Sequence, residues 1–346
     1  MRRWIIGAVI LLSIVSPVQA VSFTAPPVPE SATVLVPEQP ETFSEGLTTV
    51  LREAISYLYP AFRSAAGTCF GIIAAILLIS LVQNIPGSTK KITDIVATVS
   101  VALLLFSPSG ALIKLGAATV KELSEYGKLL LPVMTAAMAA HGGTATSAAL
   151  YAGTVFFDSL LSGVISSVIV PMLYVFLCLS VASCATGEDL LGKLVGLVKW
   201  AMTWCLKIIL YVFTGYIGIT GVVSGTADAA AIKATKLTIS GMVPVVGGIL
   251  SDASEAVLVS AGLVKSAAGV YGVVVILALW IRPFIEIGLQ YLMLKLTAGI
   301  CGMFGVKSPV RLISDFSGAM GMLLAMTGAV SLLLMVSVVC LMRGVS

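Results

Sequence analysis

"TSAALYAGTVFFDSLLSGVISSVIVPMLYVFLCLSVASC", residues 146–184, is almost continuously apolar and carries a single charge, Asp158. The run does not alternate, and it far exceeds the roughly 10 residues of a membrane β-strand, so it predicts helix. As one helix it would measure about 58 Å, whereas the hydrocarbon core of a bilayer is about 30 Å thick. Pro171 is expected to break the run. The sequence leaves two alternatives open: one long tilted helix that leaves the membrane, or two segments in a tight hairpin.

The rest of the chain is similarly apolar. Of its 346 residues, 58% are hydrophobic and 10% are charged, against about 25% charged in soluble domains. Backbone polar groups in lipid must pair internally, so the composition predicts an all-α, polytopic integral membrane protein. Further spans are expected near residues 65–85, 92–112, 201–223, 256–281, 284–306 and 317–342. These make about seven transmembrane helices, or eight if residues 146–184 form a pair.

The N-terminal part divides into a leader and a polar segment. Residues 1–20 have a basic start, a short apolar core and small residues before Ala20, as in a signal peptide; an uncleaved anchor is the alternative. Residues 21–63 are expected to be a Pro-rich, acidic, extracytoplasmic segment that ends in an amphipathic helix over 46–63. Residues 64–346 are expected to form the polytopic membrane domain.

The orientation of the spans is less clearly marked. Lys90 and Lys91 follow the first span, and the positive-inside rule makes that turn cytoplasmic. Seven spans after a cleaved leader put the N-terminus outside and the C-terminus inside. Lys307 and Arg311 then fall outside, which conflicts with the rule.

The charged residues inside the expected spans include Asp158, Glu286 and Lys295, with Lys265 near one end of the 256–281 span. Charges at membrane depth cost several kcal/mol, so they are expected to face a partner, a cavity or the interface. Glu286 and Lys295 are nine residues apart and point to opposite faces of one helix. Each is therefore expected to have a partner elsewhere: another helix, another subunit or water. Two interpretations remain open, ordinary pairing or snorkelling on one side and a cavity-lining or partner-contact role on the other.

Several classes of function are disfavoured. The net charge of +4 is scattered, without basic runs, so nucleic acid is not an expected partner. The six cysteines include no C-x-x-C pair, which argues against a disulfide framework or a zinc site. Gly187, Gly192 and Lys193 begin a phosphate-binding motif, but Leu194 stands where its hydroxyl residue belongs. Intramembrane protease motifs are absent from the sequence. No cofactor, metal or catalytic residue is expected, and the protein is predicted not to be an enzyme.

Residues 224–255, "SGTADAAAIKATKLTISGMVPVVGGILSDASE", interrupt the apolar pattern. A weakly apolar helix would be broken at Gly241 and Pro244, followed by a short apolar dip and a new helix start. Discontinuous elements of this kind occur at membrane depth where they line protein or water. The stretch therefore predicts a broken, re-entrant or interfacial hairpin, with a surface loop as the alternative. Its charged residues are candidates for cavity lining or partner contact: Asp228, Lys233, Lys236, Asp252 and Glu255.

The same stretch carries a family resemblance. Residues 218–255, and above all "DAAAIKATK" and "PVVGGILSDASE", resemble the stage III sporulation protein AE family of endospore-forming bacteria. The similarity is expected to extend from about residue 65 to 340. The resemblance implies a non-enzymatic subunit, scaffold or pore, of the channel between mother cell and forespore, located in the outer forespore membrane.

The resemblance also implies partners. These are other proteins of the same operon, including a cytoplasmic ATPase and ring-forming membrane proteins, together with a forespore membrane partner. Assembly of several copies into a homo-oligomer is compatible with such a role. The alternative from a different class is a self-contained secondary transporter, which would account for buried charges and a broken helix. A transporter of that kind predicts an internal repeat, and no convincing repeat is present in the sequence.

Overall fold

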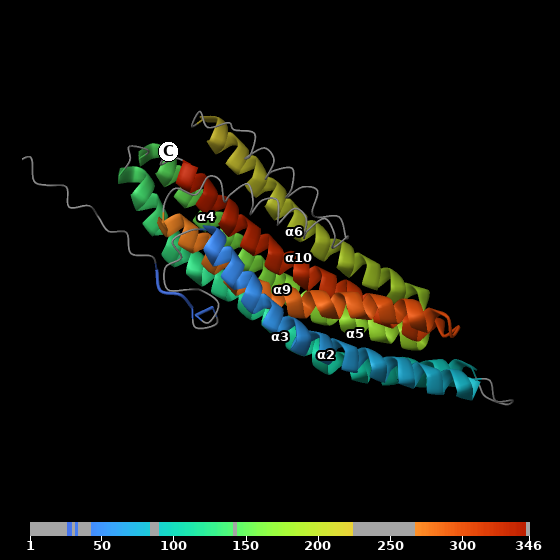
Figure 1. The fold of residues 1–346 in the computed structure, drawn as a ribbon. Coiled ribbons are helices and arrows are strands. Elements are labelled where there is room, and N and C mark those ends of the chain that lie inside the picture. Colours follow the sequence, from blue (N-terminus) through green and yellow to red (C-terminus); the bar gives the residue numbers. More distant parts are fainter. Residues whose placement is uncertain are drawn as a thin grey trace, which may run out of the picture.

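The computed structural model describes residues 26–29, 32–33, 43–83, 90–140, 144–223 and 267–343. Apart from two short N-terminal pieces, these residues form long helices, and the predicted all-α class is confirmed (Figure 1). The elements are α2 (Phe43–Gln83), α3 (Lys90–Ala140), α4 (Thr144–Val164), the π-helix η1 (Ile165–Ile169), α5 (Val170–Thr186), α6 (Asp189–Val223), α9 (Ala267–Gly302) and α10 (Lys307–Arg343).

The described residues contain six helices that are long and apolar enough to cross a membrane, with α4, η1 and α5 counted together as one. The prediction of a multi-pass helical membrane protein is thereby confirmed. The leader at 1–20 and the hairpin at 224–255 lie outside the described residues, and both stay predictions.

The run at 146–184 is one continuous helix rather than a hairpin. It is interrupted by a single π-turn at η1, where Val170 N–H donates to Ile165 O. Pro171 has no N–H to donate to the carbonyl four residues earlier, and the wider turn lets the helix pass this position without breaking. The helix ends at Gly187, whose left-handed φ of 72° suits glycine.

Proline also fails to end helices elsewhere. Pro60 lies inside α2, Pro108 and Pro132 inside α3, and Pro283 inside α9. The break expected between the spans 256–281 and 284–306 is therefore absent, because Pro283 is buried and neighbouring helices can re-satisfy the backbone groups that a buried proline frees.

Six segments that the sequence separates merge into three helices. The amphipathic helix at 46–63 and the span at 65–85 are both parts of α2. The span at 92–112 and the mixed-charge residues 114–128 that follow it are both parts of α3. The parts of 256–281 and 284–306 that the structure describes belong to a single helix, α9. The merged helices are long: the 51 residues of α3 correspond to about 76 Å.

Helices α9 and α10 form the centre of the bundle, and Figure 1 shows them enclosed by α2, α3 and α5, with α6 on the outside. Most large side chains of α10 are buried, as are those of α9 from Val273 to Trp280. Phe106 stacks edge-on against Phe316 at 5.6 Å, and Gly127 lies against Leu334. The second contact lies further along the sequence than the first in both helices, so α3 and α10 run parallel.

Because α3 and α10 are parallel, the connections between helices can be assigned to the two ends of the bundle. The starts of α3, α6 and α10 lie together with the ends of α2, α5 and α9, at what we call the turn end (Figure 1). The starts of α2, α4 and α9 and the C-terminus of α10 lie at the opposite end. Lys90 and Lys91 begin α3, and Lys307 and Arg311 lie in the first turns of α10. All four residues are therefore at the turn end.

Candidate functional site

Five of the predicted site residues cannot be placed. Asp228, Lys233, Lys236, Asp252 and Glu255 lie outside the described residues, as does the whole stretch 224–255. Their role in cavity lining or partner contact stays a prediction. The remaining three, Asp158, Glu286 and Lys295, lie on described helices.

Asp158 is a buried carboxylate between α4 and α3, with 1% of the residue exposed. Ser124 Oγ donates a hydrogen bond of 2.6 Å to its Oδ2 atom. Lys128, one turn further along α3, adds an attractive charge. Asp158 Oδ1 is buried and has no hydrogen-bond partner among the described residues. Asp158 thus faces a neighbouring helix, and its role in cavity lining or partner contact stays a prediction.

A second polar contact lies one turn before Asp158 on the same helix. Thr154 Oγ1 donates to Ser337 Oγ at 3.1 Å, and Ser337 in turn donates to the carbonyl of Leu333. Thr154 and Ser337 are both buried. Together with Ser124, these residues connect α4 to α3 on one side and to α10 on another.

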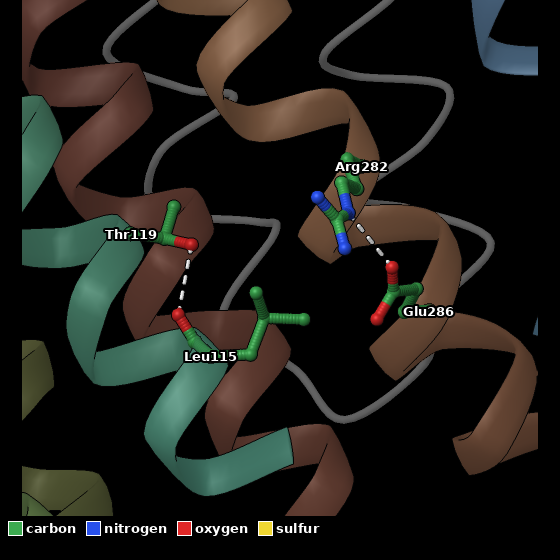
Figure 2. A network of polar contacts seen from close by, with 4 residues as sticks. All are labelled: Leu115, Thr119, Arg282 and Glu286. Carbon is green, nitrogen blue, oxygen red and sulfur yellow. Dashed lines mark hydrogen bonds and ion pairs between the residues drawn. The ribbon is translucent and has the colours of Figure 1, made fainter. Parts of the chain in front are cut away.

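Glu286 pairs within its own helix, so the expectation of a partner elsewhere is wrong. Arg282 Nε lies 2.9 Å from Glu286 Oε1, one turn earlier on α9 (Figure 2). Arg282 also lies over the ring of Tyr57 on α2, 5.6 Å from its centroid. Glu286 and Lys295 are too far apart on the helix to pair with each other. Arg282 is four residues before Glu286, and residues at this spacing are neighbours on one helix face.

Figure 2 shows the Arg282–Glu286 pair on α9 together with Thr119 of α3, whose Oγ1 donates to the carbonyl of Leu115 at 2.9 Å. Glu122 of α3 also attracts the Arg282 guanidinium electrostatically. The Arg282 and Glu286 side chains are 50% and 27% exposed.

Lys295 is exposed and also interacts within α9. Its Nζ lies 5.9 Å from the ring centroid of Tyr291, an arrangement typical of a weak cation–π contact. Asp158, on α4, interacts with α3, whereas Glu286 and Lys295 interact within α9. The three predicted residues therefore do not form one site.

The sequence analysis missed a polar group at the turn end, which we call the turn-end cluster: Ser180 and Ser183 of α5, Lys199 of α6, and Arg311 and Asp315 of α10. Arg311 and Lys199 both act electrostatically on Asp315, and Ser180 lies beside its carboxylate. Ser180 Oγ, Ser183 Oγ and Asp315 Oδ2 are buried and have no hydrogen-bond partner among the described residues.

Two glycines allow the cations of this cluster to approach the neighbouring helix. A Cβ atom at Gly192 of α6 would lie 2.7 Å from Arg311 Nη2. A Cβ atom at Gly318 of α10 would lie 3.4 Å from Lys199 Nζ. Each helix thus offers a bare stretch of backbone to the long cationic side chain of the other.

A sequence signal for the turn-end cluster existed. Arg311 and Asp315 have the i,i+4 spacing of residues on one helix face. The expected topology hid it, because it placed Arg311 in an outside loop and Lys199 in an amphipathic cytoplasmic stretch. No group of three or more His, Cys, Asp or Glu side chains able to hold a metal ion occurs among the residues that the structure describes.

Comparison with known proteins identifies the family. The family model for stage III sporulation protein AE matches residues 39–344. Stage III sporulation protein AE of Bacillus subtilis (strain 168) is 22% identical over 293 residues, which cover 83% of this chain and 73% of that protein. No solved structure matches the chain. The match includes every long helix described above, and the chain belongs to the stage III sporulation protein AE family.

Proposed function

We propose that this protein is a non-enzymatic membrane subunit, scaffold or pore-forming, of the channel between mother cell and forespore, needed for spore development after engulfment. Family membership carries the proposal. Its location would be the outer forespore membrane, and six long apolar helices support a multi-pass membrane protein. Its partners would be other proteins of the same operon, including an ATPase and ring-forming membrane proteins, and a partner in the forespore membrane.

The distribution of basic residues supports an orientation for this role. Lys193, Lys307 and Arg311 lie within about two turns of the turn end, and Lys90 and Lys91 begin α3 there. The positive-inside rule then puts the turn end in the mother-cell cytoplasm, where an ATPase would be met. α6 ends and α9 begins at the opposite end, which would then face the intermembrane space.

Buried polar residues support a role in which helices bind or move against one another. Asp158 keeps an unpartnered acceptor between α3 and α4, and buried ionisable groups in membrane proteins commonly mark contact or transport sites. The same observation is the one that favours a self-contained secondary transporter. The two candidates differ in whether the isolated protein moves a solute.

Deletion of the gene in an endospore-forming host tests the proposal. We expect engulfment to finish and spore development to stop afterwards, and normal spore formation would contradict the proposed role. Purification of the tagged protein from sporulating cells should recover the operon's ATPase and ring-forming proteins. Solute uptake into liposomes by the protein alone, without those partners, would favour the transporter instead.

A further inference from the structure

We propose that the turn-end cluster binds the phosphate group of an anionic phospholipid between α6 and α10. Arg311 and Lys199 both act electrostatically on Asp315. Within the cluster, two cations therefore stand against one carboxylate. Both cationic residues are exposed, so an anion can reach them from outside the bundle.

The cluster also contains a donor that lacks an acceptor. Ser180 and Ser183 are 0% and 2% exposed. Ser180 lies beside the Asp315 carboxylate, whereas the Ser183 hydroxyl has no hydrogen-bond partner among the described residues. Ser183 Oγ lies 3.5 Å from where a Cβ of Gly192 would be, on the side of α6 that Arg311 Nη2 also approaches. A small shift of α6 would let a phosphate oxygen accept from Ser183 and from Arg311 together.

The two glycines leave room for the cations beside the neighbouring helix. Without a Cβ at Gly192, the Arg311 guanidinium lies against the α6 backbone, and Gly318 allows the same for Lys199 against α10. Long cationic side chains lose considerable rotamer freedom when they bind an anion. A side chain packed against a neighbouring helix has fewer rotamers open to it, so it loses less of that freedom on binding.

The position of the cluster favours a lipid over a soluble anion. Arg311 is four residues from the start of α10 and Gly192 three residues from the start of α6, about 4.5–6 Å along each axis. Lys199 lies ten residues from the start of α6, about 15 Å along its axis. On α6 next to Lys199, Trp200 and Trp204 are 60% and 45% exposed, with ring centroids 6.2 Å apart. Exposed tryptophans are enriched at the headgroup level of membranes. Acyl chains can cover this α6 face while the phosphate reaches the cations.

Lipid binding to the purified full-length protein in a neutral detergent tests the proposal. Dioleoyl-phosphatidylglycerol should bind and raise the thermal unfolding midpoint, whereas dioleoyl-phosphatidylcholine should not. Arg311→Ala or Lys199→Ala should each weaken phosphatidylglycerol binding roughly five-fold, as expected for one basic residue near an anionic lipid. Arg311→Lys should stay within two-fold of the parent, and so should Lys114→Ala, which removes an exposed cation on α3 outside the cluster.

Gly192→Ala distinguishes a specific binding site from electrostatic attraction alone. It keeps both cations but displaces Arg311 from the α6 backbone, so the affinity for phosphatidylglycerol should fall as it does in Arg311→Ala. This variant also serves if Arg311→Ala does not fold. Equal loss in Lys114→Ala, or unchanged affinity in both Gly192→Ala and Lys199→Ala, would overturn the proposal. Equal stabilisation by inorganic phosphate at the same concentration would show a soluble-anion site and contradict lipid binding.

Discussion

Ser124 Oγ lies 2.6 Å from Asp158 Oδ2, and both residues are almost fully buried between α3 and α4. A hydrogen bond to a charged group is worth more than one between neutral groups, and a buried acceptor left without its donor is costly. Ser124→Ala should therefore lower the free energy of unfolding by about 1–3 kcal/mol. Thermal unfolding of the purified protein in detergent measures the effect.

A double-mutant cycle distinguishes this bond from ordinary packing. Once Ser124 is alanine, Asp158→Ala should cost much less than it does in the parent, since both partners have then been removed. Additive effects of the two substitutions would show that the bond contributes little. Ser166→Ala, at an exposed position of η1, is the control and should change the midpoint little.

Gly153 of α4 lies directly under the ring of Tyr216 of α6, which hydrogen-bonds the carbonyl of Ala149. A Cβ atom at 153 would overlap the Tyr216 ring. Gly153→Ala should therefore separate α4 from α6 and destabilise the protein by about 1–3 kcal/mol, the usual cost of overpacking. Gly163 of the same helix has nothing within 4 Å of its would-be Cβ. Gly163→Ala should be neutral or slightly stabilising, because alanine favours helix over glycine. Equal losses at both positions would contradict the packing explanation.

The fold class was predictable because long apolar runs leave no other solution in lipid, and all six spanning helices coincide with expected spans at least in part. The helix boundaries were less predictable. The break expected between 256–281 and 284–306 falls at Pro283, but this proline lies within α9. Pro283 is buried, so neighbouring helices can compensate for the carbonyl that it leaves free, and the sequence does not reveal those neighbours.

The candidate site was predictable only where a charge was isolated in an apolar run. Asp158 met that condition, and its partner Ser124 is 34 residues away. Arg282 was read as part of a break between spans, so its pairing with Glu286 was missed. The turn-end cluster contains residues of three helices, and the sequence spacing indicates only that Arg311 and Asp315 are neighbours.

The Arg282–Glu286 pair allows a test of charge balance. Arg282→Gln leaves Glu286 without its partner at 2.9 Å, and unpaired charges in a membrane protein are costly. We expect reduced protein levels and fewer spores from Arg282→Gln, and substantial recovery in Arg282→Gln/Glu286→Gln. Spore counts and immunoblots of membrane fractions measure both effects. Glu125→Gln, which breaks an exposed pair with Lys121 on α3, should have little effect. No recovery in the double variant would show that Arg282 acts through something other than this pair.

The turn between α9 and α10 provides the sharpest test of orientation, because two topologies place it on opposite sides of the membrane. Seven separate spans put Lys307 outside, whereas a single α9 places it with the other basic turns, and the positive-inside rule then makes it cytoplasmic. Met303 is 77% exposed in this turn. Met303→Cys, in a chain whose exposed Cys178 is replaced by serine, should resist a membrane-impermeant maleimide in intact cells that carry the protein in their plasma membrane, and should react in inverted vesicles. Lys121→Cys, whose parent side chain is 75% exposed towards the other end of α3, should show the reverse pattern. Labelling of Met303→Cys in intact cells would overturn the proposed orientation, and with it the proposal that the turn end meets a cytoplasmic ATPase.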